Sequence, residues 1–424
     1  MKKLKAILIG AGNRGTAYTD IMSDMSDKFE VVAVAEPIDS RREHVKSLHN
    51  IPDELCFTDY KPLLALGKIA DIAIIATMDR QHFEPAMMAI SLKYHLLLEK
   101  PIAPTAEECY QITKAAREND VHVVICTVLR YTPLFRKVKD LLNSGVIGDI
   151  KSIDHQECVG NIHQSHSFVR GNWGNEAKSS PMLLQKSCHD LDMLSWVIGK
   201  RCKSVSSFGE LSFFKAENAP DGSPDYCVQG CPHADTCPYN AIKVYYDDKA
   251  NDWFRTTCTR LANPTDDDVM KAITETQYGK CVYKCDNDVV DHQVVSMLFE
   301  DDVTVTFTMT AFTDAGRITH FMGTKGEIIV QMDGEGFIKL HTFDNAKNET
   351  INASSVGDIA HGHGGGDQGI LVALYDYVMG TYEGDSIPEI AESNYSHQLV
   401  FAAEKARLDK SIVDVEAFVK DYTL

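Results

Sequence analysis

The sequence predicts an α/β protein: a doubly wound parallel sheet, followed by a second α/β domain built on an open-faced mixed or antiparallel sheet. Three observations lead to this prediction. Short apolar runs alternate with amphipathic segments over residues 1–128, a glycine-rich turn follows the first apolar run, and Val303–Thr310 alternates apolar residues with Thr. We expect residues 1–128 to form the NAD-binding domain and residues 129–424 to form the second domain.

The first domain contains short apolar runs that we predict to be strands. These runs are Ala6–Gly10, Val31–Ala35, Ile72–Ala76, His95–Leu98 and Val121–Cys126. Thr16–Met25 is the first predicted helix, and amphipathic segments separate the later strands. Near-continuous apolar strands between helices are typical of a parallel sheet that is covered on both faces.

The pattern changes after residue 133, where a predicted helix, Leu134–Asn143, precedes strand-like sequence that begins near Ile150. Val303–Thr310 has one apolar and one polar face, so the second sheet should be covered on one side only. The later predicted elements are strands at Arg317–Met322, Glu327–Met332 and Phe337–Phe343, and helices at Gln368–Val378 and Glu392–Leu408. The segment Ala216–Asp286 is rich in Pro, Asn, Asp and Cys and is interpreted as an insertion.

Charge and hydropathy exclude several kinds of partner. Lys and Arg number 42 against 61 Asp and Glu, a net charge of −19, which would repel nucleic acid and anionic membranes. No apolar run approaches the roughly 18–20 residues that span a bilayer. The MKKLK start imitates a signal peptide, but the apolar run ends at Asn13 without a cleavage pattern, so we expect a cytoplasmic protein. Its 12 cysteines should then be thiols or metal ligands.

A dinucleotide-binding fingerprint follows the first strand. Gly10, Gly12 and Gly15 form a G-x-G-x-x-G turn that opens a helix, whose amides and partial positive charge suit a pyrophosphate. Glu36 ends the second strand 21 residues after Gly15, where an acid binds a ribose 2′-hydroxyl. A carboxylate there would repel a 2′-phosphate, so NAD is favoured over NADP, although Arg41 and its neighbour Arg42 weaken that choice.

Further motifs carry a family resemblance through nearly the whole chain. They are Thr77-Met78-Asp79-Arg80-Gln81-His82, Glu99-Lys100-Pro101, Arg130-Tyr131-Thr132-Pro133, Ile147-Gly148-Asp149-Ile150, His189-Asp190-Leu191-Asp192 and Gly323-Thr324-Lys325-Gly326-Glu327. The sequence resembles the glucose-fructose oxidoreductase / inositol dehydrogenase / MocA family, in a subgroup with a Cys-rich insertion. The resemblance implies a Rossmann domain, an open-faced α/β domain, and hydride transfer between a carbinol and nicotinamide. The cofactor contacts that we expect are Gly10, Gly12, Asn13, Arg14, Gly15, Glu36, Thr77, His82, Glu99, Lys100 and Pro101.

The resemblance also places the catalytic groups. The resemblance implies that Lys100 lies beside both the ribose of the cofactor and the substrate. His189 is the matching general acid or base, because imidazole titrates near neutral pH. Gln185 stands four residues before His189, where the family usually has Asp, and an amide cannot take a proton. Lys186 shares a helix face with His189 and is a third catalytic candidate, with a solvated helix lysine as the alternative. Beyond them, Asp190 and Asp192 could orient His189, contact substrate or face water, and for Asp192 we expect that it faces water.

Substrate contacts are expected from several places in the chain. The candidates are Arg130, Tyr131, His166, Arg170, Trp173, Gln185 and His363. Asp367, at the end of a Gly- and His-rich loop, is interpreted as a helix N-cap. Metal binding by His361 and His363 is less favoured than substrate contact.

The insertion carries a cysteine pattern. Cys227-x3-Cys231-x5-Cys237 with Cys281 as fourth ligand would make a structural zinc site. Cys258, Cys285 and His233 are rivals for the fourth position, and reduced thiols without metal are the alternative of about equal weight.

Three functions are compatible with these residues. The leading one is an NAD-dependent dehydrogenase of a sugar, glycoside or cyclitol. The second is a glycoside hydrolase that retains NAD and oxidises a ring carbon transiently, and the third is a non-catalytic NAD sensor. Self-association through the open sheet face is expected in each case.

Overall fold

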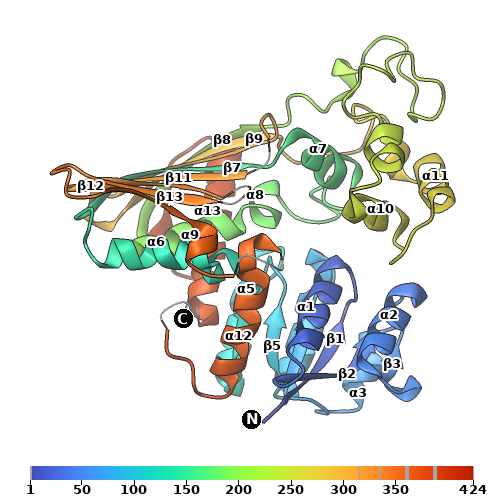
Figure 1. Ribbon diagram of the computed structural model, residues 1–424, viewed down its shortest axis with the longest axis horizontal. Helices are drawn as coiled ribbons and strands as arrows, with labels where there is room; N and C mark the ends of the chain where they lie inside the picture. The colour runs from blue at the N-terminus through green and yellow to red at the C-terminus, as the bar shows by residue number, and fades with distance from the viewer. Residues whose placement is uncertain are drawn as a thin grey trace.

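The computed structural model describes residues 2–314, 316–332, 334, 336–358, 362–384 and 389–423. Within them the chain forms two sheet-based domains and a helical insertion, with the insertion above helices α1 and α2 (Figure 1). None of the helices in these ranges is both long and apolar enough to traverse a bilayer. His361 lies outside the described residues.

The first domain is built on a six-stranded sheet in the order β3-β2-β1-β4-β5-β6, with every neighbouring pair parallel. Its strands are β1 (Leu4–Ile9), β2 (Phe29–Ala35), β3 (Cys56–Phe57), β4 (Ile72–Ile75), β5 (His95–Leu98) and β6 (Val123–Ile125). The helices between them are α1 (Asn13–Asp24), α2 (Asp39–His49), α3 (Tyr60–Ala65), α4 (Phe83–Ser91) and α5 (Ala106–Asn119). The predicted doubly wound sheet is confirmed, and its central strands are apolar because helices cover both faces.

The second domain contains a nine-stranded sheet in the order β14-β13-β12-β11-β7-β10-β9-β8-β15. Its strands are β7 (Ile150–Cys158), β8 (Cys202–Glu210), β9 (His292–Phe299), β10 (Thr304–Thr310), β11 (Gly316–Gly323), β12 (Gly326–Gln331), β13 (Phe337–Thr342), β14 (Asn348–Asn352) and β15 (Val413–Asp414). Strands β7 and β10 pair in parallel and the other pairs are antiparallel, so the predicted mixed sheet is confirmed.

Helices cover one face of this second sheet (Figure 1). Outside the insertion, the α-helices after β6 are α6 (Pro133–Asn143), α7 (Asn161–His163), α8 (Met182–Gln185), α9 (Cys188–Ile198), α12 (Gly366–Val378), α13 (Ile390–Asp409) and α14 (Val415–Val419). Strand β10 alternates buried apolar residues with exposed or half-buried Thr, as the one-sided sheet predicts. Helix α12 follows the second sheet in the chain but packs with Ile370 and Leu374 in the core of the first domain.

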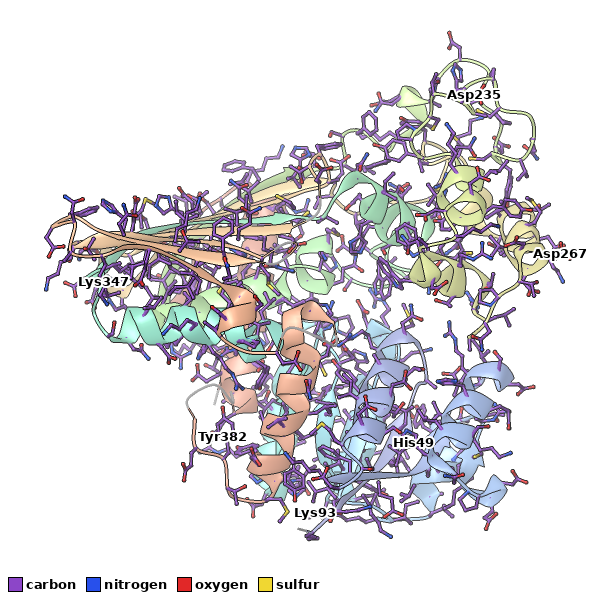
Figure 2. The ribbon with its side chains drawn as sticks, in the orientation of Figure 1. His49, Lys93, Asp235, Asp267, Lys347 and Tyr382 are labelled. Atoms are coloured by element: carbon purple, nitrogen blue, oxygen red, sulfur yellow. The ribbon has the colours of Figure 1, made fainter. Side chains whose placement is uncertain are left out.

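The insertion has its own small core. Its two regular helices, α10 (Asp252–Thr259) and α11 (Asp266–Glu275), pack around buried Tyr245, Phe254 and Tyr278. In Figure 2, Asp235 and Asp267 mark the insertion at the end of the molecule opposite Lys347, which lies in the turn between β13 and β14.

Candidate active site

The glycine turn joins β1 to α1 at the carboxyl edge of the parallel sheet. Gly10 has φ of +90°, and a Cβ there would lie 2.7 Å from the carbonyl oxygen of Ala76. A Cβ at Gly15 would lie 2.0 Å from the carbonyl oxygen of Gly10. Both glycines are therefore required by the packing of the turn itself.

Gly12 differs, because a Cβ there would meet nothing closer than Nη1 of Arg41, at 3.8 Å. The N-terminus of α1 has no side-chain cap and no acidic residue in its first turn, which leaves its amides available to an anion. Open space at Gly12 and uncapped amides at α1 fit the pyrophosphate of a dinucleotide.

Glu36 lies beside this turn, at the end of β2, and is buried. Its carboxylate accepts hydrogen bonds from the amides of Ala11, at 2.7 Å, and Ile38, at 2.9 Å. Each carboxylate oxygen has a second lone pair, so Glu36 can still accept from a ribose hydroxyl. The side chain of Arg42 is turned away from the cofactor position, since it donates to the backbone oxygen of Glu36 and to Asp39.

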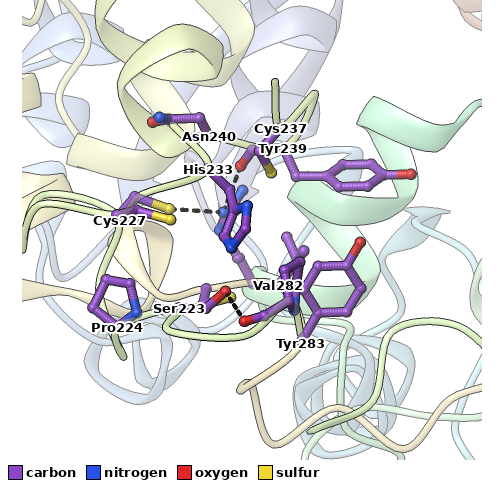
Figure 3. Close-up of a pocket in the computed structure, with 13 residues that line it drawn as sticks. Ser223, Pro224, Cys227, His233, Cys237, Tyr239, Asn240, Val282 and Tyr283 are labelled. Atoms are coloured by element: carbon purple, nitrogen blue, oxygen red, sulfur yellow. Dashed lines mark hydrogen bonds between the residues drawn. The ribbon is translucent and has the colours of Figure 1, made fainter. Parts of the chain in front are cut away.

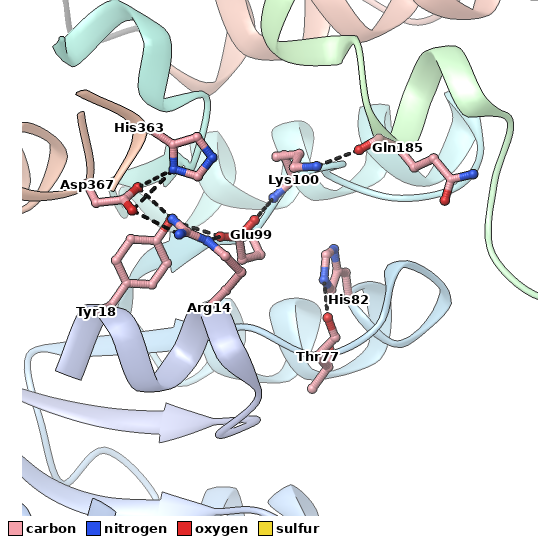
Figure 4. A network of polar contacts seen from close by, with 9 residues as sticks. All are labelled: Arg14, Tyr18, Thr77, His82, Glu99, Lys100, Gln185, His363 and Asp367. Carbon is pink, nitrogen blue, oxygen red and sulfur yellow. Dashed lines mark hydrogen bonds and ion pairs between the residues drawn. The ribbon is translucent and has the colours of Figure 1, made fainter. Parts of the chain in front are cut away.

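His82 ties together two loops at the carboxyl ends of β4 and β5. Its ring nitrogens lie 3.1 Å from the carbonyl oxygen of Thr77 (Figure 4) and 2.7 Å from that of Pro101. Pro101 follows Lys100 through a cis peptide bond. His82 therefore positions the loop that carries Lys100.

A network of ion pairs links the glycine turn to α12 (Figure 4). Arg14 donates to Glu99 at 2.9 Å and to both carboxylate oxygens of Asp367, at 2.7 and 2.9 Å. Burial raises the pKa of Glu99, but the charges of Arg14 and Lys100 outweigh it and hold that pKa below its usual range. The side chain of Arg14 is thus held between two carboxylates, and Glu99 also accepts from Tyr18 at 2.8 Å.

The interpretation of Asp367 as a helix N-cap is wrong. Helix α12 begins at Gly366 with Gly365 as its N-cap, and Asp367 lies within the first turn. Its carboxylate binds Arg14 and also lies 3.1 Å from Nδ1 of His363. Asp367 therefore joins the first domain to the loop that carries His363.

Lys100, His189 and His363 converge where the two domains meet. Lys100 donates from Nζ to the backbone oxygen of Gln185 at 2.5 Å, and the rings of His189 and His363 are 6.0 Å apart. His189 is 6 % exposed, and its Nδ1 has no hydrogen-bond partner in the described part of the chain. Burial lowers the pKa of His189, and the nearby charge of Lys100 lowers it further, so the ring is neutral at pH 7.

A ladder of alternating charges lies beside His189. Lys186 pairs with Glu157 at 3.2 Å, Glu157 with Arg317 at 2.5 Å, and Arg317 with Asp190 at 2.7 Å. Asp190 also accepts from His155 at 2.9 Å. Burial lowers the pKa of Lys186; Glu157 opposes this effect, whereas Arg317 and Lys100 add to it.

Sequence reasoning missed Glu157, His155 and Arg317 as site residues. The signal for the first two was their spacing, because Ile153, His155 and Glu157 are buried and alternate with exposed residues of β7. Arg317 stands in a strand that was predicted correctly, but nothing in the sequence pairs it with Asp190.

The predicted substrate residues Arg130 and Tyr131 lie in the interior. Arg130 is 4 % exposed and binds both carboxylate oxygens of Asp192. The expectation that Asp192 faces water is therefore wrong, since this carboxylate is fully buried and also accepts from Ser396 at 2.9 Å. The ring of Tyr131 packs in the core of the first domain. Neither side chain is brought together with Lys100.

Trp173 and Gln185 lie closer to the predicted site. Trp173 donates to Asp79 at 3.1 Å, which places the indole against the loop after β4. The Gln185 amide donates to the backbone oxygens of Trp173 and Ser180, both at 2.9 Å, so it positions the loop before α8. The backbone oxygen of Gln185, rather than its side chain, contacts Lys100.

His166 and Arg170 are directed into the insertion. The His166 ring stacks on Phe254 with centroids 4.1 Å apart, and burial lowers its pKa to about 3. Arg170 is 1 % exposed and donates to the backbone oxygens of Lys280, at 2.8 Å, and Tyr239, at 2.7 Å. The structure does not bring these two side chains together with Lys100 or His189.

The four cysteines predicted to bind zinc line one small cavity of about 20 Å³, together with His233 and Arg170 (Figure 3). The rivals Cys258 and Cys285 do not line it. Across the described ranges, no three His, Cys, Asp or Glu side chains stand as they would around a bound metal ion. The four cysteines chosen from the sequence thus lie at one place, and the described residues show no formed metal centre there.

A Rossmann sheet whose glycine turn lies near a lysine and a neutral histidine defines a dinucleotide-dependent oxidoreductase. Comparison with known families agrees. Residues 4–127 match the model of an oxidoreductase family described as an NAD-binding Rossmann fold, and residues 139–411 match the same family's C-terminal alpha/beta domain. The chain therefore belongs to the GFO/IDH/MocA oxidoreductase family, which confirms the resemblance inferred from its motifs.

Individual relatives are more distant. A putative oxidoreductase of Bacillus subtilis, YteT, is 22% identical over 84% of each chain. Inositol 2-dehydrogenase of Salmonella typhimurium is 24% identical over 48% of this chain and 57% of the relative. A solved structure of levoglucosan dehydrogenase, in complex with NADH and L-sorbose, superposes with a TM-score of 0.70 at 16% identity, over 98% of this chain and 99% of the other. That last likeness supports the fold.

Proposed function

We propose that the protein is an NAD-dependent dehydrogenase that oxidises a carbinol of a sugar, glycoside or cyclitol. The observation that carries this proposal is the position of His189, neutral and buried next to the cation Lys100. The names of the inositol and levoglucosan dehydrogenases support a polyhydroxylated substrate. Bound NAD would supply the hydride acceptor.

The residues around His189 are suited to a hydroxyl group that loses its proton. Lys100 and Arg317 place positive charge beside His189, and the field that lowers the pKa of the imidazole also lowers that of a bound alcohol. Neutral His189 accepts a proton, and partly buried Lys186, with its lowered pKa, can pass one on. His363, on the exposed side, is proposed to contact substrate together with Trp173.

The cofactor would be held by the glycine turn and its surroundings. Gly12 and the amides of α1 would bind the pyrophosphate, Glu36 a ribose, and the loops of Thr77 and Lys100 the nicotinamide half. Glu36 favours NAD over NADP, because a buried carboxylate would repel a 2′-phosphate.

The test is a screen for NADH formation across hexoses, uronates, inositols and glycosides. With a confirmed substrate, Lys100→Met and His189→Ala should each lower kcat by about 100-fold or more while NADH still binds. Turnover that survives His189→Ala would contradict the catalytic assignment. No turnover with any substrate, despite NADH binding, would favour a sensor.

A redox-assisted glycoside hydrolase is the second candidate. It is favoured by Gln185, whose amide is engaged by the backbone of Trp173 and Ser180 where the family usually has an acid. Release of an aglycone without net NADH would identify the hydrolase, whereas accumulation of NADH identifies the dehydrogenase.

We also propose that the cysteine cavity binds one zinc ion. Arg170 supports this proposal: its Nη1 is buried without a hydrogen-bond partner and no carboxylate pairs with it among the described residues, while its Nη2 lies 3.6 Å from Sγ of Cys227. A buried cation without a counter-ion is costly, and four thiolates around a divalent ion would supply negative charge. Protein purified without chelator should contain about one zinc per chain. A protein that is fully folded but contains no zinc would contradict this proposal.

Self-association through the open face of the second sheet is a further proposal. Phe208 on β8 and Ile318 on β11 are 70 % and 39 % exposed, and Phe208 stands opposite Val294 of β9. Light scattering should detect a dimer or larger oligomer, and a monomer at micromolar concentration would contradict it. A cytoplasmic location is proposed as well, because the cysteines in the structure are all free.

A further inference from the structure

The insertion reaches across to the cofactor position. Asn13, which directly follows Gly12 and begins α1, donates from its side-chain amide to Oγ1 of Thr257 on α10, at 2.9 Å. These two residues are 244 positions apart in the chain, and Figure 1 shows α10 and α11 above α1 and α2. The insertion therefore contacts the very turn that is suited to a pyrophosphate.

Two arginines belong to the elements at this contact, Arg41 to α2 and Arg260 to the end of α10, three residues after Thr257. Arg41 belongs to α2, and its Nη1 is 3.8 Å from the position of a Cβ on Gly12. Arg260 ends α10 in the left-handed conformation, with φ of +61°. Neither guanidinium makes a hydrogen bond or ion pair with any residue that the structure describes.

In the described part of the chain, no carboxylate forms an ion pair with either of these two guanidinium groups. Burial lowers the pKa of Arg41; Glu36 opposes this effect, and the like charge of Arg260 adds to it. The carboxylate of Glu36 accepts hydrogen bonds from two backbone amides, and in the described part of the chain it forms no ion pair with either arginine. Two cations without a counter-ion beside an anion cradle are most simply explained by an anion that binds between them.

The insertion does not pack closely against the rest of α2. A cleft of about 680 Å³ separates the two, between His44 and Ser47 of α2 and Leu261 and Asn263 of the insertion. The hydrogen bond from Asn13 to Thr257 thus joins the insertion to the glycine turn, and the cleft leaves room for the insertion to move.

We propose that the insertion is the outer wall of the dinucleotide site: Thr257 secures the glycine turn, and Arg260 together with Arg41 binds a phosphate of the cofactor. Release of the cofactor then requires this wall to open, so the insertion slows the release of the dinucleotide. The inference rests on the proposed binding of NAD, but not on the substrate.

The test measures release of NADH from the full-length protein by stopped-flow fluorescence after a chase with excess NAD⁺. Arg260→Asn removes the charge and keeps a residue that tolerates the left-handed conformation, and Thr257→Val removes the hydroxyl at nearly equal volume. Release should be faster by about tenfold for the first variant and about threefold for the second. Lys271→Ala, which removes an exposed charge from α11, is the matched control and should release NADH at the native rate.

Repeating the measurement with NADPH identifies the phosphate. Equal acceleration for both cofactors assigns Arg260 to the pyrophosphate, and acceleration for NADPH alone assigns it to the 2′-phosphate. Native release rates for both variants with both cofactors would overturn the inference. Failure of the native protein to bind either cofactor would instead refute the proposed function.

Discussion

Gly12→Ala provides a sharp test of the cofactor cradle, because the structure separates its effect on binding from its effect on folding. The added methyl group would lie no closer than 3.8 Å to any protein atom. Gly12 has ordinary backbone angles, φ −70° and ψ −173°, so no left-handed strain arises. As Gly12 is the N-cap of α1, the expected loss of stability is at most about 1 kcal/mol.

The substitution should weaken the binding of NADH more than it lowers the stability of the protein. A pyrophosphate held by the amides of α1 would collide with the new methyl group, and overpacking of this kind costs about 1–3 kcal/mol. The Kd for NADH should therefore rise by about 5- to 150-fold. Calorimetric titration gives the Kd, and urea unfolding gives the stability.

Gly15→Ala is the complementary variant. Its Cβ would lie 2.0 Å from the carbonyl oxygen of Gly10, so the helix must move away from the strand, at a cost of about 3 kcal/mol or more. A native Kd for NADH in Gly12→Ala would refute the reasoning, because the open space above Gly12 would then not be where the dinucleotide lies.

Three other variants probe the remaining features. Glu157→Gln removes the carboxylate that raises the pKa of Lys186, so that pKa should fall further and the acidic limb of the kcat–pH profile should move to lower pH. Asp192→Ala leaves the guanidinium of Arg130 buried without its partner, and urea unfolding should show a loss of about 3–5 kcal/mol. Cys237→Ser should lower the zinc content from about one per chain to near zero, measured by elemental analysis.

Each of these variants has a matched control. Asp154→Asn changes an exposed carboxylate on the same strand as Glu157 and should leave the pH profile in place. Glu392→Ala breaks an exposed ion pair with Arg201 and should cost at most about 1 kcal/mol. Cys285→Ser removes a thiol outside the cavity and should keep the metal. If a variant and its control behave alike, the corresponding assignment is wrong.

The first sheet could be predicted from the sequence because its signals are local. Four residues of β4 and most of β5 are buried apolar positions, and the glycine turn stands directly between β1 and α1. The alternation of apolar residues with Thr also predicted strand β10 and the burial of only one of its faces. Short edge strands such as β3 and β15, of two residues each, leave no such pattern and were not predicted.

The polar interior could not be predicted in the same way. A sequence pattern shows that Arg130 or Asp192 is charged, but not that the two lie together with no access to water. The position of Arg317 between Glu157 and Asp190 likewise depends on the pairing of β11 with β7, which is set by packing over long sequence separations. Buried ion pairs form between elements that are distant in the chain, so they are invisible to periodicity.

The most direct test is a crystal structure of the full-length protein with NAD⁺ bound. The pyrophosphate should lie over Gly12 at the N-terminus of α1, and the nicotinamide should lie beside Lys100 and His189. A dinucleotide bound elsewhere, or a nicotinamide ring remote from His189, would contradict the assignment of this site.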